Sequence, residues 1–199
     1  MKVLRRCGPQ TYVKLEEASE VSKYKIVGED ADTRFAGGGF DFFRGLGIIG
    51  YEKTFKIWLR KFPRPVFIVA TEGVNIISWV FIEEWPETAS DGSPVYVLRA
   101  IETIPTMRKR RIGLRLLMLG LQQTVGYMLT KPLTHDAERF FRRAGFMDEK
   151  ELKKAPIDLS KHPGYLVLPP FKKTTLLADM EKYFAHLDSI AQREQGAGA

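Results

Sequence analysis

The chain has 199 residues, of which 44% are hydrophobic, and this is enough apolar material for one substantial core. Lys and Arg number 31 against 24 Asp and Glu, so the net charge is +7. This surplus favours phosphorylated cofactors, nucleic acids or anionic membranes as partners and selects none of them.

A single cysteine, Cys7, excludes an internal disulfide, and residues 1–9 lack the apolar run of a signal peptide. The longest apolar runs, 66–70 and 74–82, fall short of the roughly 18 residues that a membrane-spanning helix needs. We therefore expect a cytoplasmic protein without a membrane partner, and we assign no role to Cys7.

The first half of the chain predicts a helix followed by an antiparallel hairpin. Large apolar side chains recur at helical spacing over residues 51–62, and Pro63 ends that pattern. Two runs rich in β-branched and aromatic residues follow, 66–70 and 74–81. Residues 11–26 are half-polar and poorly periodic, so their pattern defines no particular element.

The second half alternates strands and helices. A strand is predicted over residues 95–104, and an almost entirely apolar helix over residues 112–123. A further strand over residues 125–130 precedes a helix that Gly145 ends. The order of these elements indicates an α/β protein.

The end of the chain predicts one more strand and one more helix. A short strand is expected over residues 165–168, and apolar residues at helical spacing indicate a helix that begins near Thr174 or Thr175. We divide the chain into one domain over residues 1–171, a terminal helix over residues 172–192 that packs on it, and a flexible tail over residues 193–199.

Four consecutive basic residues lie between the strand over residues 95–104 and the apolar helix that follows. They are Arg108, Lys109, Arg110 and Arg111. The first N–H groups of a helix have no partner within it, and together with the helix dipole they attract anions. This arrangement indicates a phosphate-binding turn.

Residues 101–117 resemble the coenzyme A motif of the GNAT acetyltransferase superfamily, in which a strand ends in Pro and Arg/Gln-x-x-Gly-x-Gly/Ala opens a helix. Pro105 fixes the register, so Arg108 begins the motif and Gly113 occupies its last position. Arg111 stands where the family has glycine. Residues 137–146 resemble a later helix of the family, in which Phe141 replaces the usual tyrosine that protonates the departing thiolate.

The resemblance implies a mixed, mostly antiparallel central sheet with splayed strands, flanked by helices, plus a C-terminal helix. It implies an N-acetyltransferase that moves an acetyl group from acetyl-CoA to an amine of a protein or small molecule by direct attack. Backbone N–H groups within residues 101–104 are expected to polarise the acetyl carbonyl. The residues expected to bind the cofactor are Ile101, Thr103, Ile104, Arg108, Lys109, Arg110, Arg111, Ile112, Gly113 and Phe141.

Direct attack requires a deprotonated amine, and a lysine-like amine has a pKa of about 10.4. Glu102 is the first candidate for the base, because alternation along the strand directs its side chain opposite to those of Ile101 and Thr103. A surface or ion-paired carboxylate is an equally good interpretation of Glu102. His135, just before a helix, is the second candidate, and Tyr127 is a weaker candidate for the acid.

A rival pattern occurs earlier in the chain. Residues 45–50 match the glycine spacing of a dinucleotide-binding loop. The segment before them is too short and polar for a buried strand, and the hairpin after them is not a parallel crossover. For an acetyltransferase we expect residues 37–50, with Phe40, Phe42 and Phe43, to form a mobile loop between early helices that lines the acceptor site. The alternative is a glycine-rich turn packed by aromatic residues.

Other classes of protein stay open. The basic cluster and the aromatic content of 12% also fit a nucleic-acid-binding module, although no reader motif accompanies them. The replacements at Phe141 and Arg111 also allow a protein that binds the cofactor without catalysis. The three histidines lie far apart and predict no metal site. We expect a monomer or a homodimer.

Overall fold

The computed structural model describes residues 1–29, 38–48, 50–152 and 156–196 of the chain. Contacts divide the chain into two compact units. The first unit comprises Met1–Glu83 and Leu98–Gln123, and the second comprises Glu84–Val97 and Thr124–Ala199. Strand β6 (Val95–Thr103) contributes residues to both units.

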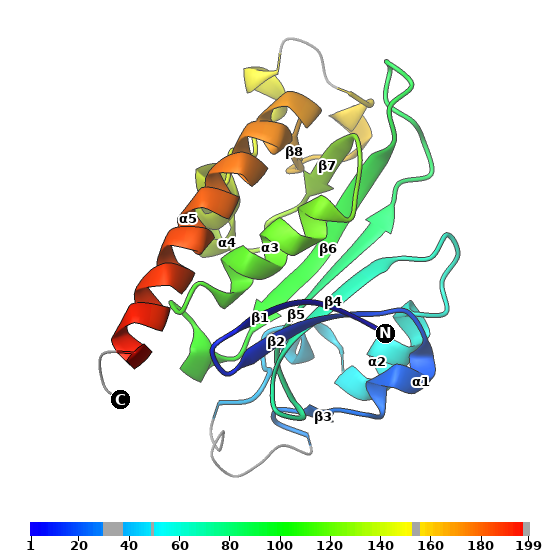
Figure 1. Ribbon diagram of the computed structural model, residues 1–199. Coiled ribbons are helices and arrows are strands. Elements are labelled where there is room, and N and C mark those ends of the chain that lie inside the picture. Colours follow the sequence, from blue (N-terminus) through cyan, green and yellow to red (C-terminus); the bar gives the residue numbers. More distant parts are fainter. Residues whose placement is uncertain (30–37, 49, 153–155, 197–199) are drawn as a thin grey trace. The chain divides into compact units, whose positions relative to one another are not determined.

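The first unit contains a sheet with the strand order β1-β2-β4-β5-β6 (Figure 1). The strands before β6 are β1 (Lys2–Cys7), β2 (Gln10–Leu15), β3 (Lys25–Ile26), β4 (Val66–Glu72) and β5 (Asn75–Glu84). β1, β2, β4 and β5 pair antiparallel in that order, and β3 pairs parallel with β5. The predicted hairpin is confirmed, with Val69 opposite Trp79.

The continuous apolar runs of β4 and β5 form strands that are buried on both faces. Residues 66–71 and 75–82 are all buried. On one face, α2 (Tyr51–Trp58) contributes Trp58, whose ring stacks on that of Phe81 with centroids 4.4 Å apart. On the other face, α3 (Ile112–Gln122) packs closely enough that a Cβ added to Gly120 would lie 2.7 Å from Ile82 Cδ1. The two helices therefore enclose the hairpin.

The helix predicted over residues 51–62 is shorter than expected: α2 ends at Trp58. After Trp58 the chain continues in tighter turns, with Arg60 N and Lys61 N donating to Ile57 O and Trp58 O at 3.1 Å, and Pro63 disfavours helical dihedrals in Phe62. The start of α2 was predicted correctly, although Gly50 has no side chain to cap it. The carboxylate of Glu29 accepts hydrogen bonds from Tyr51 N (2.7 Å) and Glu52 N (3.4 Å) in its place.

Strands β1 and β2 were not predicted, and a short helix, α1 (Ala18–Val21), follows them. β6 and α3 agree with the prediction to within one residue, and the strand over residues 95–104 ends at Thr103. Pro105 opens a 3-10 turn over Pro105–Met107 that leads toward α3.

The second unit contains the start of β6 and then β7 (Tyr127–Thr130) and β8 (Leu166–Leu168), which pair antiparallel. Helix α4 (His135–Arg143) ends where Gly145 adopts a φ of 88°. The core of this unit includes Trp85, Val97 and Val167. These elements confirm the predicted order of strand, helix and strand.

Helix α5 (Pro170–Gly196) is longer than predicted at both ends. It begins at Pro170 rather than near Thr174, because proline is well tolerated in the first turn of a helix. Residues 193–196 were predicted to be part of a flexible tail and are helical; the last part of that prediction, residues 197–199, lies outside the described residues. Among the residues that the structure describes, no helix is both long and apolar enough to cross a bilayer.

Candidate functional site

The turn between β6 and α3 has an uncommon backbone conformation. Lys109 and Arg111 both have a φ of 63°, in the left-handed region that residues other than glycine rarely adopt. Arg111 is the N-cap of α3, and its side chain makes no capping hydrogen bond. Arg111 therefore replaces the glycine of the motif while its backbone keeps a conformation that favours glycine.

The start of α3 carries N–H groups that precede the first hydrogen bond of the helix. That bond runs from Arg115 N to Arg111 O at 3.0 Å, so the N–H groups of Ile112, Gly113 and Leu114 come before it. The four basic residues from Arg108 to Arg111 are all exposed. Main-chain donors, the helix dipole and exposed cations together make this turn a physically suitable site for a phosphate group.

The start of α3 lies against the end of β6. A Cβ added to Gly113 would lie 3.5 Å from Thr103 Oγ1, which is an ordinary van der Waals contact. Arg108 reinforces this arrangement, because its Nε donates a hydrogen bond to Thr103 O at 3.2 Å. Its guanidinium also lies 3.6 Å from the carboxylate of Asp41. Arg108 therefore links β6 to the loop that contains Asp41.

Glu102 of β6 is buried, with 5% of its surface exposed. Its Oε1 accepts hydrogen bonds from Asp41 N (3.3 Å) and Phe42 N (3.0 Å), and its Oε2 accepts one from Tyr51 Oη (3.1 Å). Burial raises the pKa of Glu102 above the usual carboxyl range, although the three hydrogen bonds oppose this shift. The described partners of Glu102 are neutral donors, and Glu102 is buried rather than at the surface.

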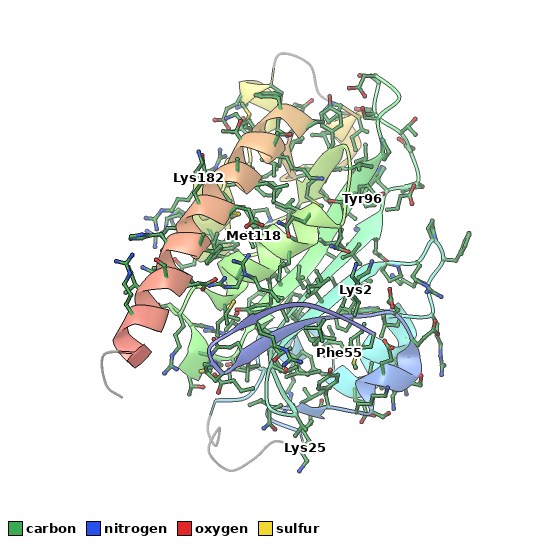
Figure 2. The ribbon with its side chains drawn as sticks, in the orientation of Figure 1. Lys2, Lys25, Phe55, Tyr96, Met118 and Lys182 are labelled. Atoms are coloured by element: carbon green, nitrogen blue, oxygen red, sulfur yellow. The ribbon has the colours of Figure 1, made fainter. Side chains whose placement is uncertain are left out.

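Tyr51 was not identified from the sequence, where it appears only as the first residue of a helix. Its ring is fully buried, and the ring centroid lies 5.3 Å from that of Phe40 and 6.2 Å from that of Trp79. Phe55, labelled in Figure 2, belongs to the same aromatic cluster. Burial, followed by the nearby charge of Glu102, raises the pKa of Tyr51 well above its usual value. The Tyr51 hydroxyl is therefore a permanent donor at physiological pH.

Residues 38–48, called the phenylalanine loop below, are held both by their backbone and by their side chains. Phe40 is buried in the aromatic cluster, and Glu102 binds the next two backbone N–H groups. Phe42 and Phe43 are half-buried, with ring centroids 5.0 Å apart. Their predicted role in lining the acceptor site stays a prediction, and residue 37 of that predicted loop lies outside the described residues.

The glycine pattern over residues 45–50 does not follow a strand. Arg44–Leu46 forms a 3-10 turn, Gly47 has a φ of 95°, and the described residues 38–43 contain no strand. Ile49 lies outside the described residues. The minor alternative of a dinucleotide-binding loop fails here, because such a loop must connect a buried strand directly to a helix.

The hydrogen bonds of β6 bear on which N–H groups of residues 101–104 could polarise the acetyl carbonyl of the cofactor. Ile104 N already donates a hydrogen bond to Ile77 O at 3.1 Å, and Ser78 Oγ donates one to Glu102 O at 2.7 Å. Because backbone groups alternate in direction along a strand, the N–H groups of Ile101 and Thr103 point to the opposite edge of β6. Ile101 and Thr103 are therefore better candidates for this role than Ile104.

The other predicted site residues belong to the second unit. The Tyr127 hydroxyl donates a hydrogen bond to Asp91 Oδ2 at 2.9 Å, and burial together with this bond raises its pKa. His135 is exposed at the first position of α4. Phe141 is 3% exposed and packs against Phe146, with ring centroids 5.2 Å apart. The roles assigned to these three residues stay predictions.

The second unit also contains a cavity of about 380 Å³. Arg142 lines it and binds the carboxylates of Glu138 (2.9 Å), Asp148 (3.1 Å) and Glu151 (2.9 Å). The charged groups of this cavity are largely paired with one another, so we assign no catalytic role to them.

Comparison with known proteins shows similarity only at the level of structure. No protein-family model matches the chain, and no curated protein matches it in sequence. Three solved structures match over 80–85% of this chain and at least 98% of their own chains. They are KacTA in complex with DNA (TM-score 0.61, 12% identity), AtaTR bound with acetyl-CoA (TM-score 0.54, 11% identity) and an acetyltransferase assigned to the GNAT family from Desulfovibrio desulfuricans (TM-score 0.53, 16% identity).

These matches confirm the predicted fold class. The chain has the fold of the GNAT acetyltransferases, with a mixed, mostly antiparallel sheet flanked by helices. At 16% identity or less the likeness defines the fold alone.

Proposed function

We propose that the chain is an acetyl-CoA-dependent N-acetyltransferase that acts on an amine acceptor. The observation that carries the proposal is the juxtaposition, within one unit, of the exposed basic turn at the start of α3 with the buried carboxylate of Glu102 on β6. The fold, shared with a structure that contains acetyl-CoA, supports the same assignment.

The residues of the turn fit the anionic part of the cofactor. The N–H groups of residues 112–114 would donate hydrogen bonds to the pyrophosphate, and the exposed cations of residues 109–111 would neutralise its charge. Acetyl-CoA supplies an acetyl group activated as a thioester. The N–H groups of Ile101 and Thr103 are the candidates for polarising the acetyl carbonyl, and Phe141 stays a candidate for contact with the cofactor.

Glu102 is suited to hold the proton that the acceptor amine releases. A carboxylate has about four acceptor positions, two on each oxygen, and three of those on Glu102 are filled from the described residues. The remaining position is on Oε2. The raised pKa of Glu102 brings its basicity closer to that of an amine, which favours proton transfer. Because Glu102 is 5% exposed, the transfer would run through a water molecule.

Calorimetric titration with acetyl-CoA tests the cofactor site. Arg110→Glu should raise Kd by about tenfold or more, because it puts a negative charge beside the pyrophosphate. Lys182→Glu makes the same change of charge on exposed α5 and should leave Kd within about twofold. Equal losses in the two variants would show that only the net charge matters and would remove the turn from the proposal.

An assay of coenzyme A release tests the activity. Acetyl-CoA is supplied with spermidine, with a peptide that has a free α-amine, or with a peptide that has a free lysine side chain. Release above the acceptor-free rate with one class identifies the acceptor class. If acetyl-CoA leaves Tm unchanged while DNA or RNA raises it in a salt-sensitive manner, the nucleic-acid-binding alternative replaces the proposal.

A further inference from the structure

The hydrogen bond from Tyr51 and the acceptor position of Glu102 that none of the described residues fills are on the same oxygen. The two loop N–H groups of Asp41 and Phe42 both bind Oε1, whereas Tyr51 binds Oε2. The oxygen that would take up the substrate proton is therefore the oxygen whose charge and direction Tyr51 controls.

Tyr51 is held firmly enough to direct that oxygen. Its ring is fully buried in the aromatic cluster, with Phe55 at 5.8 Å between ring centroids. Its backbone N–H donates a hydrogen bond to Glu29 Oε1 at 2.7 Å, at the start of α2. The hydroxyl is thus fixed both by its packed ring and by the position of the helix.

We propose that Tyr51 is a positioning residue, which orients Glu102 Oε2 for proton transfer and sets the pH at which Glu102 becomes ionised. This inference rests on the proposed function for its catalytic part, whereas its effect on ionisation holds whether or not the chain transfers acetyl groups. A hydrogen bond to the charged form of a carboxylate favours that form, so Tyr51 lowers the pH at which Glu102 loses its proton.

Among the residues that the structure describes, Tyr51, Asp41 and Arg108 bear on the ionisation of Glu102. Tyr51 reaches it from α2, and Asp41 approaches from the phenylalanine loop, where its negative charge opposes ionisation of Glu102. Arg108 lies 3.6 Å from the Asp41 carboxylate and partly offsets that charge. Of these groups, Tyr51 is the one whose side chain donates a hydrogen bond directly to the Glu102 carboxylate.

The decisive experiment is an NMR titration of the protein labelled with ¹³C at glutamate side-chain carboxyls, with the Glu102 signal assigned by its loss in Glu102→Gln. In Tyr51→Phe, which keeps the packed ring, the Glu102 midpoint should move to higher pH. Tyr24→Phe removes another hydroxyl of the same unit, one that contacts Met1 Sδ, and should leave the midpoint unchanged. An unmoved or lowered midpoint in Tyr51→Phe overturns the proposal.

A second variant tests the proposal even if Tyr51→Phe does not fold. Incorporation of 3-fluorotyrosine at residue 51 keeps the hydroxyl and makes it a stronger donor, so the Glu102 midpoint should move to lower pH. A midpoint that moves upward with this analogue contradicts the proposal as firmly as an unmoved one in Tyr51→Phe.

The kinetic consequence separates this inference from the proposed function. With acetyl-CoA and spermidine, kcat/KM of Tyr51→Phe should fall further below that of wild type as the pH is lowered, and the two should converge at alkaline pH, where Glu102 is ionised in both. A uniform loss at every pH would indicate a purely structural role and would overturn the positioning role. If the wild type releases no coenzyme A, the proposed function fails, and the NMR titration still decides whether Tyr51 governs Glu102.

Discussion

Lys109 and Arg111 share one backbone conformation, a left-handed φ of 63°, with a single residue between them. This conformation costs about 1–2 kcal/mol for a residue with a Cβ. The strain lies in the turn that we propose binds the cofactor, and strained residues are often found at ligand sites.

Replacing Arg111 with glycine should relieve the strain at that position. We expect Arg111→Gly to raise the free energy of unfolding by about 0.5–1 kcal/mol, after the entropy cost of glycine is subtracted. Urea denaturation measures the change. Arg110 is not among the residues with positive φ, so Arg110→Gly is the matched control and should lower stability. A loss of stability in Arg111→Gly as large as that in the control would contradict the assigned strain.

Two glycines should respond in opposite ways to alanine. Gly126 has a φ of 70°, and an added Cβ would lie 2.1 Å from Pro94 O, the same atom that accepts the hydrogen bond from Tyr127 N at 3.0 Å. Gly126→Ala should therefore lower the free energy of unfolding by about 2 kcal/mol or more. At Gly113 the nearest atom is 3.5 Å away, so Gly113→Ala should gain up to about 1 kcal/mol from helix propensity. Thermal melts that rank the two variants in the reverse order would refute these contacts.

Glu102→Gln separates the catalytic from the structural role of the carboxylate. Glutamine Oε1 can still accept the N–H groups of Asp41 and Phe42, and its amide can donate to Tyr51, so the fold should survive. The turnover number should fall by about 10²–10⁴ at neutral pH, while the Kd for acetyl-CoA stays within about twofold. Undiminished turnover would remove Glu102 from the mechanism.

The same variant should flatten the dependence of stability on pH. The folded pKa of Glu102 is raised, so between the unfolded pKa of about 4.3 and the folded pKa the native state holds more protons than the unfolded state. The contribution of Glu102 is therefore present at low pH and is lost as pH rises through the folded pKa. Urea denaturation across this range should show a smaller loss in Glu102→Gln than in wild type, and parallel curves would contradict the buried state of Glu102.

Lys173 should make the second unit more stable in mild alkali. It is 6% exposed, its Nζ donates to Thr124 O at 2.6 Å, and burial lowers its pKa to about 8. Between about pH 8 and 10 the unfolded state holds more protons, so stability from this group rises with pH. Lys173→Met should abolish the rise, whereas Lys182→Met, at an exposed position on the same helix, should retain it. A rise of equal size in both variants would assign it to other groups.

The local parts of this structure were predictable from the sequence. The hairpin of β4 and β5 and the helix α3 carry continuous apolar runs, and Pro105 fixes the register of the motif that ends at Gly113. The same register identified Arg111 as the residue in a glycine position, and the structure adds that its φ of 63° lies in the left-handed region that favours glycine.

Other parts depend on partners that are distant in sequence. β1 and β2 are half-polar and pair with each other, and β2 is joined to the sheet by pairing with β4, which lies more than 50 residues further on. The donors to Glu102 are 51–61 residues away from it, so no local pattern could reveal Tyr51. The roles of Glu102 and of the turn stay predictions from the sequence, and the structure shows which groups hold Glu102 in place.

A crystal structure with acetyl-CoA tests the central claim most directly. The account predicts pyrophosphate oxygens within hydrogen-bonding distance of the N–H groups of residues 112–114, at about 2.7–3.2 Å. A cofactor bound elsewhere on the chain, or a turn that stays empty at saturating acetyl-CoA, would contradict it.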